Sequence, residues 1–200
     1  MATATPTAER LRLAVIVGST RSGRFAPTVA SWFADLAGQR DDLSVDVVDL
    51  VETPLPATLP GFDGPSPDDA ALFDAITPRL AAADAFVVVT PEYNHSFPGA
   101  LKNLIDAHYA EWQAKPVGFV AYGGLSGGLR AVEQLRVVFA ELHAVTVRDT
   151  VSFHGAAGVF DGPVPRDAEG TGAAAKTLLD QVVWWARALR DAKSVRPYGS

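Results

Sequence analysis

One polar loop has the composition of an anion-binding site. The segment GSTRSGR lies between an apolar run and a helical stretch, and its polar side chains are those of Ser19, Thr20, Arg21, Ser22 and Arg24. Backbone amides beside glycines, hydroxyls, two guanidinium groups and a helix N-terminus together favour a phosphate group. The loop matches neither GxxxxGK followed by Ser or Thr nor GxGxxG, so a terminal monophosphate suits it better than a triphosphate or a pyrophosphate. The alternative is a capped turn with solvated arginines.

A second loop, PEYNHSFPG, begins at Pro91 and carries more polar and aromatic groups than a connection needs. Tyr93 can form an aromatic wall, and Asn94 offers a paired donor and acceptor. Pro91 and Glu92 can order the backbone turn, so the loop suits a flat ring with a polar edge. Ordinary loop roles are the alternatives: Tyr93 would pack against the core and Asn94 would form a turn or a helix cap. Glu92 and His95 would then face solvent.

The third loop, GGLSGG, runs from Gly123 to Gly128 between an apolar segment and a helical one. Backbone N–H groups of Gly123 and Gly124, with no side chain in the way, can reach the polar edge of a ring. A heterocycle with a phosphate tail therefore fits the three loops together.

The third loop also matches the G-x-S-x-G turn that presents a nucleophilic serine in hydrolases, with Ser126 as the nucleophile. Asp149 and His154 follow in the required order, but both lie around the end of one expected strand. The acid and the histidine usually come from two different strand ends. A serine hydrolase is therefore the less favoured interpretation.

The remaining chain alternates apolar, β-rich segments with stretches of helical period. The expected strands are Leu11–Val17, Val45–Leu50, Ala85–Thr90, Val117–Tyr122 and Val145–Val151. The expected helices are Phe25–Ala37, Asp68–Ala83, Pro98–Gln113, Gly127–His143 and about Ala173–Ala192. Strands this apolar are buried on both faces, which predicts an α/β fold with a five-stranded parallel sheet and helices on both faces. The common strand order 2-1-3-4-5 would bring the three polar loops into one crevice.

Length and composition exclude several classes of protein. The 200 residues, 48% of them hydrophobic, predict a single domain over residues 1–200 with its core at about 11–153. A formal net charge of −6 without a Lys/Arg block argues against a nucleic-acid partner, and the absence of cysteine excludes disulfides and thiolate ligands. Four histidines without HExxH spacing predict no metal site. The start MATATPTAER lacks a signal core and no apolar run spans a bilayer, so we expect a cytoplasmic protein with no membrane partner.

Two long connections, Glu52–Pro67 and Phe153–Gly172, are rich in proline or glycine. We expect surface loops there, and the alternative is a lid or an oligomer contact.

Three segments together resemble a known family: GSTRSGR, TPEYNHSFPGALKN and YGGLSGGLRAVEQLR. They are similar to the NAD(P)H-dependent FMN reductases, which are flavodoxin-like proteins, and the resemblance runs from about Leu11 to Phe153. It implies an enzyme with bound FMN and NADPH or NADH as the donor of hydride. The reduced flavin would pass electrons to an acceptor such as a quinone, an azo compound, a metal oxyanion or free flavin. Such chemistry requires no catalytic side chain.

The resemblance also implies which residues hold FMN. They are Ser19, Arg21, Arg24, Phe25, Pro91, Glu92, Tyr93, Asn94, Gly123, Gly124 and Ser126. The first three would hold the phosphate, with Phe25 beside it at the helix entry. The next four would line the ribityl chain and the isoalloxazine, and the last three would face the pyrimidine end of the ring. Similar proteins form dimers or tetramers with the flavin near a subunit interface. This chain departs from the family at Ala107, where a Trp is common, and the departure concerns the mode of association.

A flavodoxin-like electron carrier or regulator is the other alternative. Docking to a redox partner would favour an acidic surface around the flavin. The flavin loops instead hold Arg21, Arg24, His95 and Lys102 beside only Glu92. This balance favours the reductase.

Overall fold

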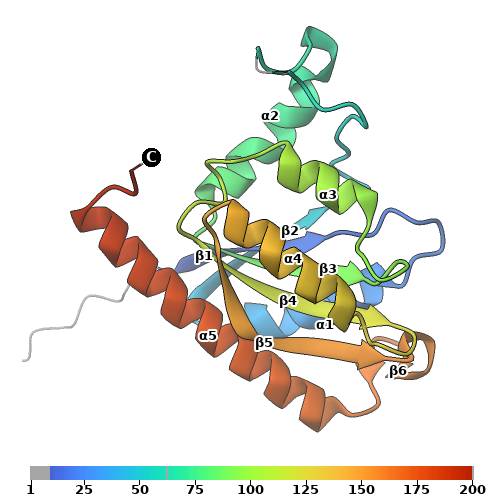
Figure 1. Cartoon of the computed structure of the whole chain (residues 1–200). Coiled ribbons are helices and arrows are strands. Elements are labelled where there is room, and N and C mark those ends of the chain that lie inside the picture. The colour runs from blue at the N-terminus through green and yellow to red at the C-terminus, as the bar shows by residue number, and fades with distance from the viewer. Residues whose placement is uncertain (1–9, 62, 200) are drawn as a thin grey trace, which may run out of the picture.

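The computed structural model describes residues 10–61 and 63–199, and its main sheet has the order β2-β1-β3-β4-β5 (Figure 1). The strands are β1 (Leu11–Val17), β2 (Leu43–Asp49), β3 (Ala85–Pro91), β4 (Pro116–Gly123) and β5 (Val145–His154). All neighbouring strands are parallel. Every residue of the central strand β3 is buried, as a parallel strand covered on both faces must be. The predicted flavodoxin-like fold and its strand order are confirmed.

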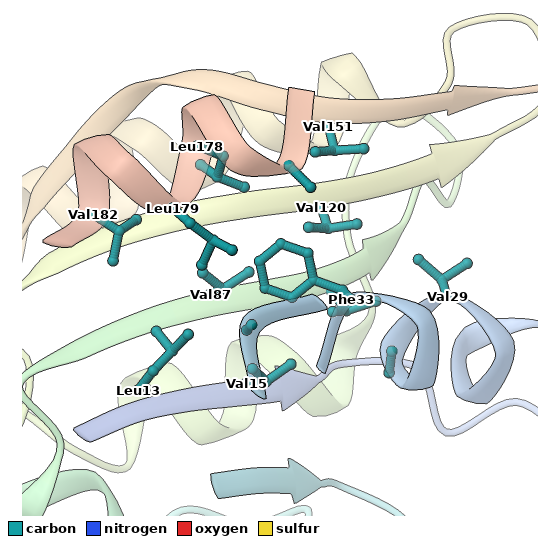
Figure 2. Packing of buried hydrophobic residues seen from close by; sticks show 14 of the residues in the cluster. Leu13, Val15, Val29, Phe33, Val87, Val120, Val151, Leu178, Leu179 and Val182 are labelled. Atoms are coloured by element: carbon teal, nitrogen blue, oxygen red, sulfur yellow. The ribbon is translucent and has the colours of Figure 1, made fainter. Parts of the chain in front are cut away.

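Helices cover both faces of the sheet. Helices α1 (Ala26–Gly38) and α5 (Ala168–Val195) pack on one face, and α2 (Pro67–Ala82), α3 (Gly99–Asp106) and α4 (Leu129–Glu141) pack on the other. Figure 2 shows the first layer, in which Phe33 of α1 and Leu179 of α5 meet Val87 of β3. The two hydrophobic layers hold the strands in place, so that the ends of β1, β3 and β4 form one rigid edge.

Helix α3 ends at Asp106, whereas the periodicity of the sequence predicts an end at Gln113. Two later side chains bind its last carbonyl groups: His108 Nδ1 donates to the carbonyl of Leu104 at 2.9 Å, and Trp112 Nε1 donates to that of Ile105 at 3.2 Å. Both rings are buried. The apolar residues after Asp106 thus pack as a capping turn, not as a further helical face.

The last helix begins earlier than expected, at Ala168 where the sequence indicated about Ala173. Asp167 explains the difference, since its carboxylate accepts a hydrogen bond from the amide of Gly170 at 2.9 Å and caps the helix. The first turn of this helix contains glycine, which is a poor helix former, so the helical periodicity of the sequence did not indicate this start.

The two long connections differ. The described part of the 52–67 connection is mostly exposed, whereas the 153–172 connection contains a 3-10 turn (Ala156–Gly158) and a small hairpin of β6 (Phe160–Asp161) and β7 (Val164–Pro165). Phe160 of this hairpin is buried against Phe25 and Phe153, with ring centroids 5.2 and 4.9 Å apart. Part of the second connection therefore packs into the hydrophobic core, so this connection is not only a surface loop.

Two further findings concern residues 10–61 and 63–199 alone. None of their helices is long and apolar enough to cross a bilayer. They contain no group of three or more His, Asp or Glu side chains arranged to hold a metal ion. The single domain expected over residues 1–200 stays a prediction, and residues 1–9, which carry the expected lack of a signal core, lie outside the described part.

Candidate functional site

The three polar loops lie side by side at the carboxyl edge of the sheet. The pairing of β1 with β3 continues beyond the strands, since the amide of Gly18 donates to the carbonyl of Val89 at 2.9 Å. The pairing of β3 with β4 continues in the same way, with the amide of Glu92 donating to the carbonyl of Tyr122 at 3.1 Å. The loops 18–25, 92–98 and 124–128 are thus fixed relative to one another by the sheet. Ligands of open α/β sheets bind at such an edge.

The first loop, residues 18–25, is called the phosphate loop below. Ser19 is buried at its base, and its hydroxyl forms a hydrogen bond of 2.9 Å with the hydroxyl of Tyr93 in the second loop. Arg21 is exposed at the rim. Phe25 is the N-cap of α1 and makes no capping hydrogen bond through its side chain, so the start of this helix keeps its favourable potential for an anion.

Arg24 has a partner that the sequence did not reveal. Its guanidinium makes two hydrogen bonds to the carboxylate of Asp49 at the end of β2, of 2.6 and 2.7 Å, and a third to the carbonyl of Ser19 at 2.8 Å. The hydrogen bonds to Asp49 raise the pKa of Arg24 above its ordinary value, although burial acts in the opposite direction. The charge of Arg24 is therefore offset by Asp49, and its main effect is to fix the backbone of the phosphate loop. The only sequence feature that could have indicated this ion pair was an acidic residue, Asp49, at the end of the strand next to β1.

The second loop contains a tight two-residue turn. The amide of Tyr93 donates to the carbonyl of Ser96 at 2.8 Å, and the amide of Ser96 donates back at 3.0 Å. Asn94 and His95 have φ angles of 50° and 68°, as a type I′ turn requires of both central residues. Asn94 is exposed at the tip of this turn, and its contact with a ring stays a prediction.

Glu92 is not at the solvent-facing end of a turn. Its side chain is only 8% exposed and accepts hydrogen bonds from the hydroxyl of Ser126 and from the backbone amide of Arg130, the latter at 3.1 Å. Arg130 Nη1 also donates to Glu92 at 3.1 Å. These three residues are called the Glu92 network. Burial alone would raise the pKa of Glu92, but the hydrogen bonds from Ser126 and Arg130 and the charge of Arg130 lower it below its ordinary value.

The Glu92 network also caps a helix. The N-cap of α4, Gly128, has no side chain to bind the first amides of the helix, and Glu92 accepts one of them from the neighbouring loop. Arg130 escaped prediction because it lies within the helical period of LRAVEQLR, where a charge normally faces solvent. A hint was its position in the first turn of a helix that lacks a capping side chain.

The glycines of the third loop have two different roles. Gly127 and Gly128 have φ angles of 64° and 90°, and a Cβ on Gly128 would lie 2.6 Å from the Cβ of Ala121. A Cβ on Gly124 would meet nothing within 4 Å. The second glycine pair is thus required by the fold, whereas Gly124 leaves open surface beside the ring site predicted from the sequence.

The geometry around Ser126 does not form a hydrolase triad. The hydroxyl of Ser126 donates to Glu92, while His154 contacts the carbonyl of Leu125 at 3.1 Å and the hydroxyl of Ser152 at 3.3 Å. Asp149 accepts from the amide of Gln181. Within the described residues no histidine hydrogen-bonds to Ser126, so the nucleophile and base that acyl transfer needs are not paired.

The donor set fits the phosphate of FMN. The hydroxyls of Ser19 and Tyr93 meet at the phosphate loop, and the ring of Tyr122 packs edge-on against Phe25 at the end of that loop, with centroids 5.8 Å apart. Tyr122 is 6% exposed, and its hydroxyl has no hydrogen-bond partner among the described residues. Hydroxyl donors, an exposed arginine and a helix N-terminus are the groups that recognise a phosphate monoester.

Comparison with known proteins agrees with this geometry. The family model described as "NADPH-dependent FMN reductase" matches residues 11–158. The NAD(P)H-dependent FMN reductase C4B3.06c of Schizosaccharomyces pombe is 37% identical over 123 residues, and the match covers 58% of this chain and 60% of that protein. The chain thus spans about three fifths of the length of this relative. The FMN-dependent NADPH-azoreductase of Staphylococcus haemolyticus is 33% identical over 180 residues, with 84% of this chain and 92% of that protein covered.

A solved structure supports the fold. The flavoenzyme NAD(P)H:(acceptor) oxidoreductase FerB from Paracoccus denitrificans superposes with a TM-score of 0.66 over 89% of this chain and 98% of that one. The sequence identity is 22%. At this identity the likeness bears on the fold, which is the parallel five-stranded architecture described above.

Proposed function

The chain belongs to the NADPH-dependent FMN reductase family, and from this premise we propose that it is an FMN-containing oxidoreductase that takes hydride from NADPH or NADH and passes it to a small-molecule acceptor. One observation carries the proposal: the hydrogen bonds of Ser19 with Tyr93 and of Ser126 with Glu92 join three loops into a single phosphate-and-ring site. FMN, when bound, supplies the hydride chemistry itself.

On the phosphate side, the residues of this chain bind and orient the cofactor. Arg21 offers an exposed guanidinium, Ser19 a buried hydroxyl, and the start of α1 a positive potential. Arg24 holds the loop in shape through Asp49. This division of work between the two arginines supports a site that recognises one phosphate group and not a longer anion.

On the ring side, the residues present a rigid backbone. The β-turn after Tyr93 and the Glu92 network fix the two loops that would line the ring. Gly124 leaves room for the ring edge, because no atom lies where its Cβ would point. In this proposal no side chain transfers a proton, so the chain contributes orientation and exclusion of water.

The acceptor is proposed to be an azo compound or a quinone, with metal oxyanions and free flavin as further members of the class. The support for an azo acceptor is the name of the Staphylococcus haemolyticus relative, an FMN-dependent NADPH-azoreductase. Exposed apolar side chains, those of Leu125 and Leu129, flank the proposed ring site and suit a flat, weakly polar acceptor.

Two measurements test the function. The purified full chain should carry or take up FMN, identified after release from the denatured protein, and FMN should raise the melting temperature of the apoprotein. Anaerobic stopped-flow mixing with NADPH or NADH should then bleach the flavin absorbance rapidly with at least one donor. A protein that neither binds nor is stabilised by FMN contradicts the cofactor, and an FMN-loaded protein that neither donor bleaches is an electron carrier and contradicts the reductase.

We further propose a homodimer or homotetramer in the cytoplasm, where reduced nicotinamides are supplied. The exposure of Leu125 (89%) and Leu129 (43%) beside the ring site supports a surface that a second copy of the chain covers. Light scattering after size exclusion tests the assembly, and a monomer at every concentration contradicts it. Cell fractionation tests the location.

A further inference from the structure

The outer side of α5 exposes large apolar side chains. Trp184 is 63% exposed and Trp185 is 37% exposed, and their rings pack edge-on with centroids 5.0 Å apart. Val195, about three turns further along the helix, is 80% exposed. The inner side of the same helix, with Leu178 and Val182, is buried against the sheet (Figure 2). Single exposed apolar residues are common on monomers, but tryptophan is enriched in protein interfaces relative to the remaining surface.

A hollow of about 510 Å³ lies directly beside Trp184. It is lined by Val183 and Ala188 together with the charged side chains of Arg40 and Arg187. Arg40 lies just before β2, so the hollow is at the amino edge of the sheet, at the other end from the phosphate loop. An indole in this hollow would meet apolar side chains and guanidinium groups, and tryptophan binds both.

Charged residues on the same side of α5 are arranged symmetrically about Trp184. Lys176 and Asp180 precede Trp184 by eight and four residues. Arg187 and Asp191 follow it by three and seven residues. All four are exposed, and spacings of three and four residues place them on one side of the helix. The order of charges along this side is therefore positive, negative, tryptophan, positive, negative.

This order is complementary to itself when two copies of the helix pack antiparallel. With the two Trp184 residues at the centre, Lys176 lies opposite Asp191 of the second copy. In the same arrangement Asp180 lies opposite Arg187 of the second copy. Two parallel helices in register would instead place each charge opposite its own copy, which is repulsive. The charges thus favour a second, antiparallel copy of α5 as the partner.

The contacts that these charges make within one chain are weak enough to be rearranged. Lys176 Nζ lies 2.7 Å from the carboxylate of Asp180, and Arg187 Nη2 lies 3.3 Å from that of Asp42. The side chains of Lys176, Asp180 and Arg187 are nevertheless 73%, 45% and 47% exposed. Ion pairs this exposed contribute little to stability. Their charges can therefore set the orientation of a partner at little cost to the single chain.

We propose that α5 is a contact between two copies of this chain, packed antiparallel about a twofold axis near Trp184, with the Trp184 of each copy in the hollow of the other. A twofold contact uses the same surface on both copies, so one protruding side chain and one hollow in each chain are sufficient. The contact is separate from the surface around Leu125 and Leu129 at the carboxyl edge, and it goes beyond the proposed function because it needs no FMN. A tetramer with twofold symmetry requires two such different contacts.

Trp184→Glu tests the contact by light scattering after size exclusion over a range of protein concentrations. The substitution should leave the fold intact, because most of this side chain is exposed. The dissociation constant of the α5 contact should rise at least about thirtyfold, the loss typical of a tryptophan at the centre of an interface. The mass of the complex should therefore fall by half. The FMN content and the rate of bleaching by NADPH or NADH should equal those of the wild type, because the flavin site lies at the other edge.

A charge exchange tests the antiparallel register. Lys176→Glu alone and Asp191→Lys alone should each weaken the association about threefold to tenfold, because each places like charges opposite one another. The double variant should restore the affinity to within about twofold. Positions 176 and 191 are roughly 22 Å apart along one helix, so only a second copy can bring them together. Arg148→Glu is the matched control, since this 91% exposed arginine lies on β5 and its reversal should leave the association unchanged.

Four results would overturn the α5 contact. They are an unchanged mass of Trp184→Glu, a double charge variant that associates no better than the single ones, and two results with a monomeric wild type. If that monomer sediments with phosphatidylglycerol vesicles and Trp184→Glu does not, the surface binds a membrane. If a soluble quencher does not reach Trp184 in that monomer, measured as the difference from Trp184→Phe, residues 1–9 fill the hollow. Failure of the wild type to bind FMN would remove the proposed function and leave the α5 contact standing, whereas failure of the contact leaves FMN binding intact.

Discussion

The phosphate loop and the Glu92 network lie at the same edge of the sheet, but they differ in how far their polar groups are already paired. In the Glu92 network, the buried carboxylate accepts from Ser126 and twice from Arg130. At the phosphate loop, Arg21 is exposed and the hydroxyl of Tyr122 has no partner among the described residues. The ring side is thus a finished scaffold, and the phosphate side keeps binding capacity for a ligand.

This contrast separates two kinds of variant. Changes on the ring side should reduce the stability of the whole protein and the affinity for flavins with or without a phosphate. Changes on the phosphate side should discriminate between FMN and riboflavin. A variant's effects on stability and on the two flavins therefore show on which side its residue lies.

The largest effect is expected from Gly128→Ala on the ring side. The φ angle of 90° is strained for alanine, and its Cβ would lie 2.6 Å from Ala121 and 2.8 Å from the amide of Tyr122. We expect a loss of roughly 3 kcal/mol or more in the free energy of unfolding, measured by denaturant titration. Gly124→Ala is the matched control, and it should change the stability by less than about 0.5 kcal/mol. Similar losses for both variants would mean that the loop is not rigid at its second glycine pair.

Glu92→Gln should give the next largest effect, a loss of roughly 1 to 3 kcal/mol in stability. The hydrogen-bonded carboxylate becomes a neutral amide, and one of its NH2 donors then faces Ser126 or Arg130. FMN and riboflavin should lose affinity by equal factors, because the change loosens both ring loops. A loss confined to FMN would place Glu92 on the phosphate side.

The same variant should show a characteristic dependence on pH. The folded protein lowers the pKa of Glu92 below its ordinary value of 4.5, so the carboxylate contributes stability that is fully present above about pH 4.5. This contribution is lost as the pH falls through the lower, folded-state pKa. The stability advantage of the wild type over Glu92→Gln should therefore be constant near neutral pH and shrink below about pH 4.5.

The two arginines of the phosphate loop should behave differently. Arg21→Ala should raise the dissociation constant for FMN by about tenfold, since a hydrogen bond to a charged group is worth about 1.5 to 3 kcal/mol. It should leave riboflavin binding and stability unchanged. Arg24→Ala should instead lower the stability by roughly 1 to 3 kcal/mol, because Asp49, whose side chain is 14% exposed, loses its partner. Calorimetry measures the flavin affinities of the two variants, and thermal melting measures their stabilities. Equal changes in both quantities for the two variants would contradict the separation of their roles.

The comparison also shows which features a sequence can reveal. The strands and their order were predictable because apolar β-rich segments and right-handed crossovers leave few arrangements. The loops were predictable because each follows a strand directly. The pairs Arg24–Asp49 and Glu92–Arg130 were not, since they join residues 25 and 38 positions apart and depend on side-chain directions that no local pattern encodes.

The early end of α3 was missed for a related reason. His108 and Trp112 read as a continuing apolar face, and only the packed structure shows them binding the last carbonyl groups of the helix. Tyr122 was predicted as the last residue of a strand that the structure extends to Gly123, but its unsatisfied hydroxyl is a property of the packing. Local pattern thus predicts where the site lies, and long-range contacts decide which side chains work there.

The smallest effect is expected from Ser126→Ala, and it decides between two chemistries. In the structure the hydroxyl of Ser126 donates to Glu92 and accepts a long hydrogen bond of 3.4 Å from the amide of Gly128. Glu92 keeps its bonds from Arg130 when that hydroxyl is removed. The loss should be about 1 kcal/mol in stability, and NAD(P)H-dependent reduction of a quinone dye should stay within about an order of magnitude of the wild type. A serine hydrolase would instead lose all turnover and all labelling by a fluorophosphonate probe. Because no histidine among the described residues hydrogen-bonds to Ser126, we expect the wild type to resist the probe from the start. Labelling of wild type that disappears in Ser126→Ala would overturn the assignment of the third loop to a flavin ring.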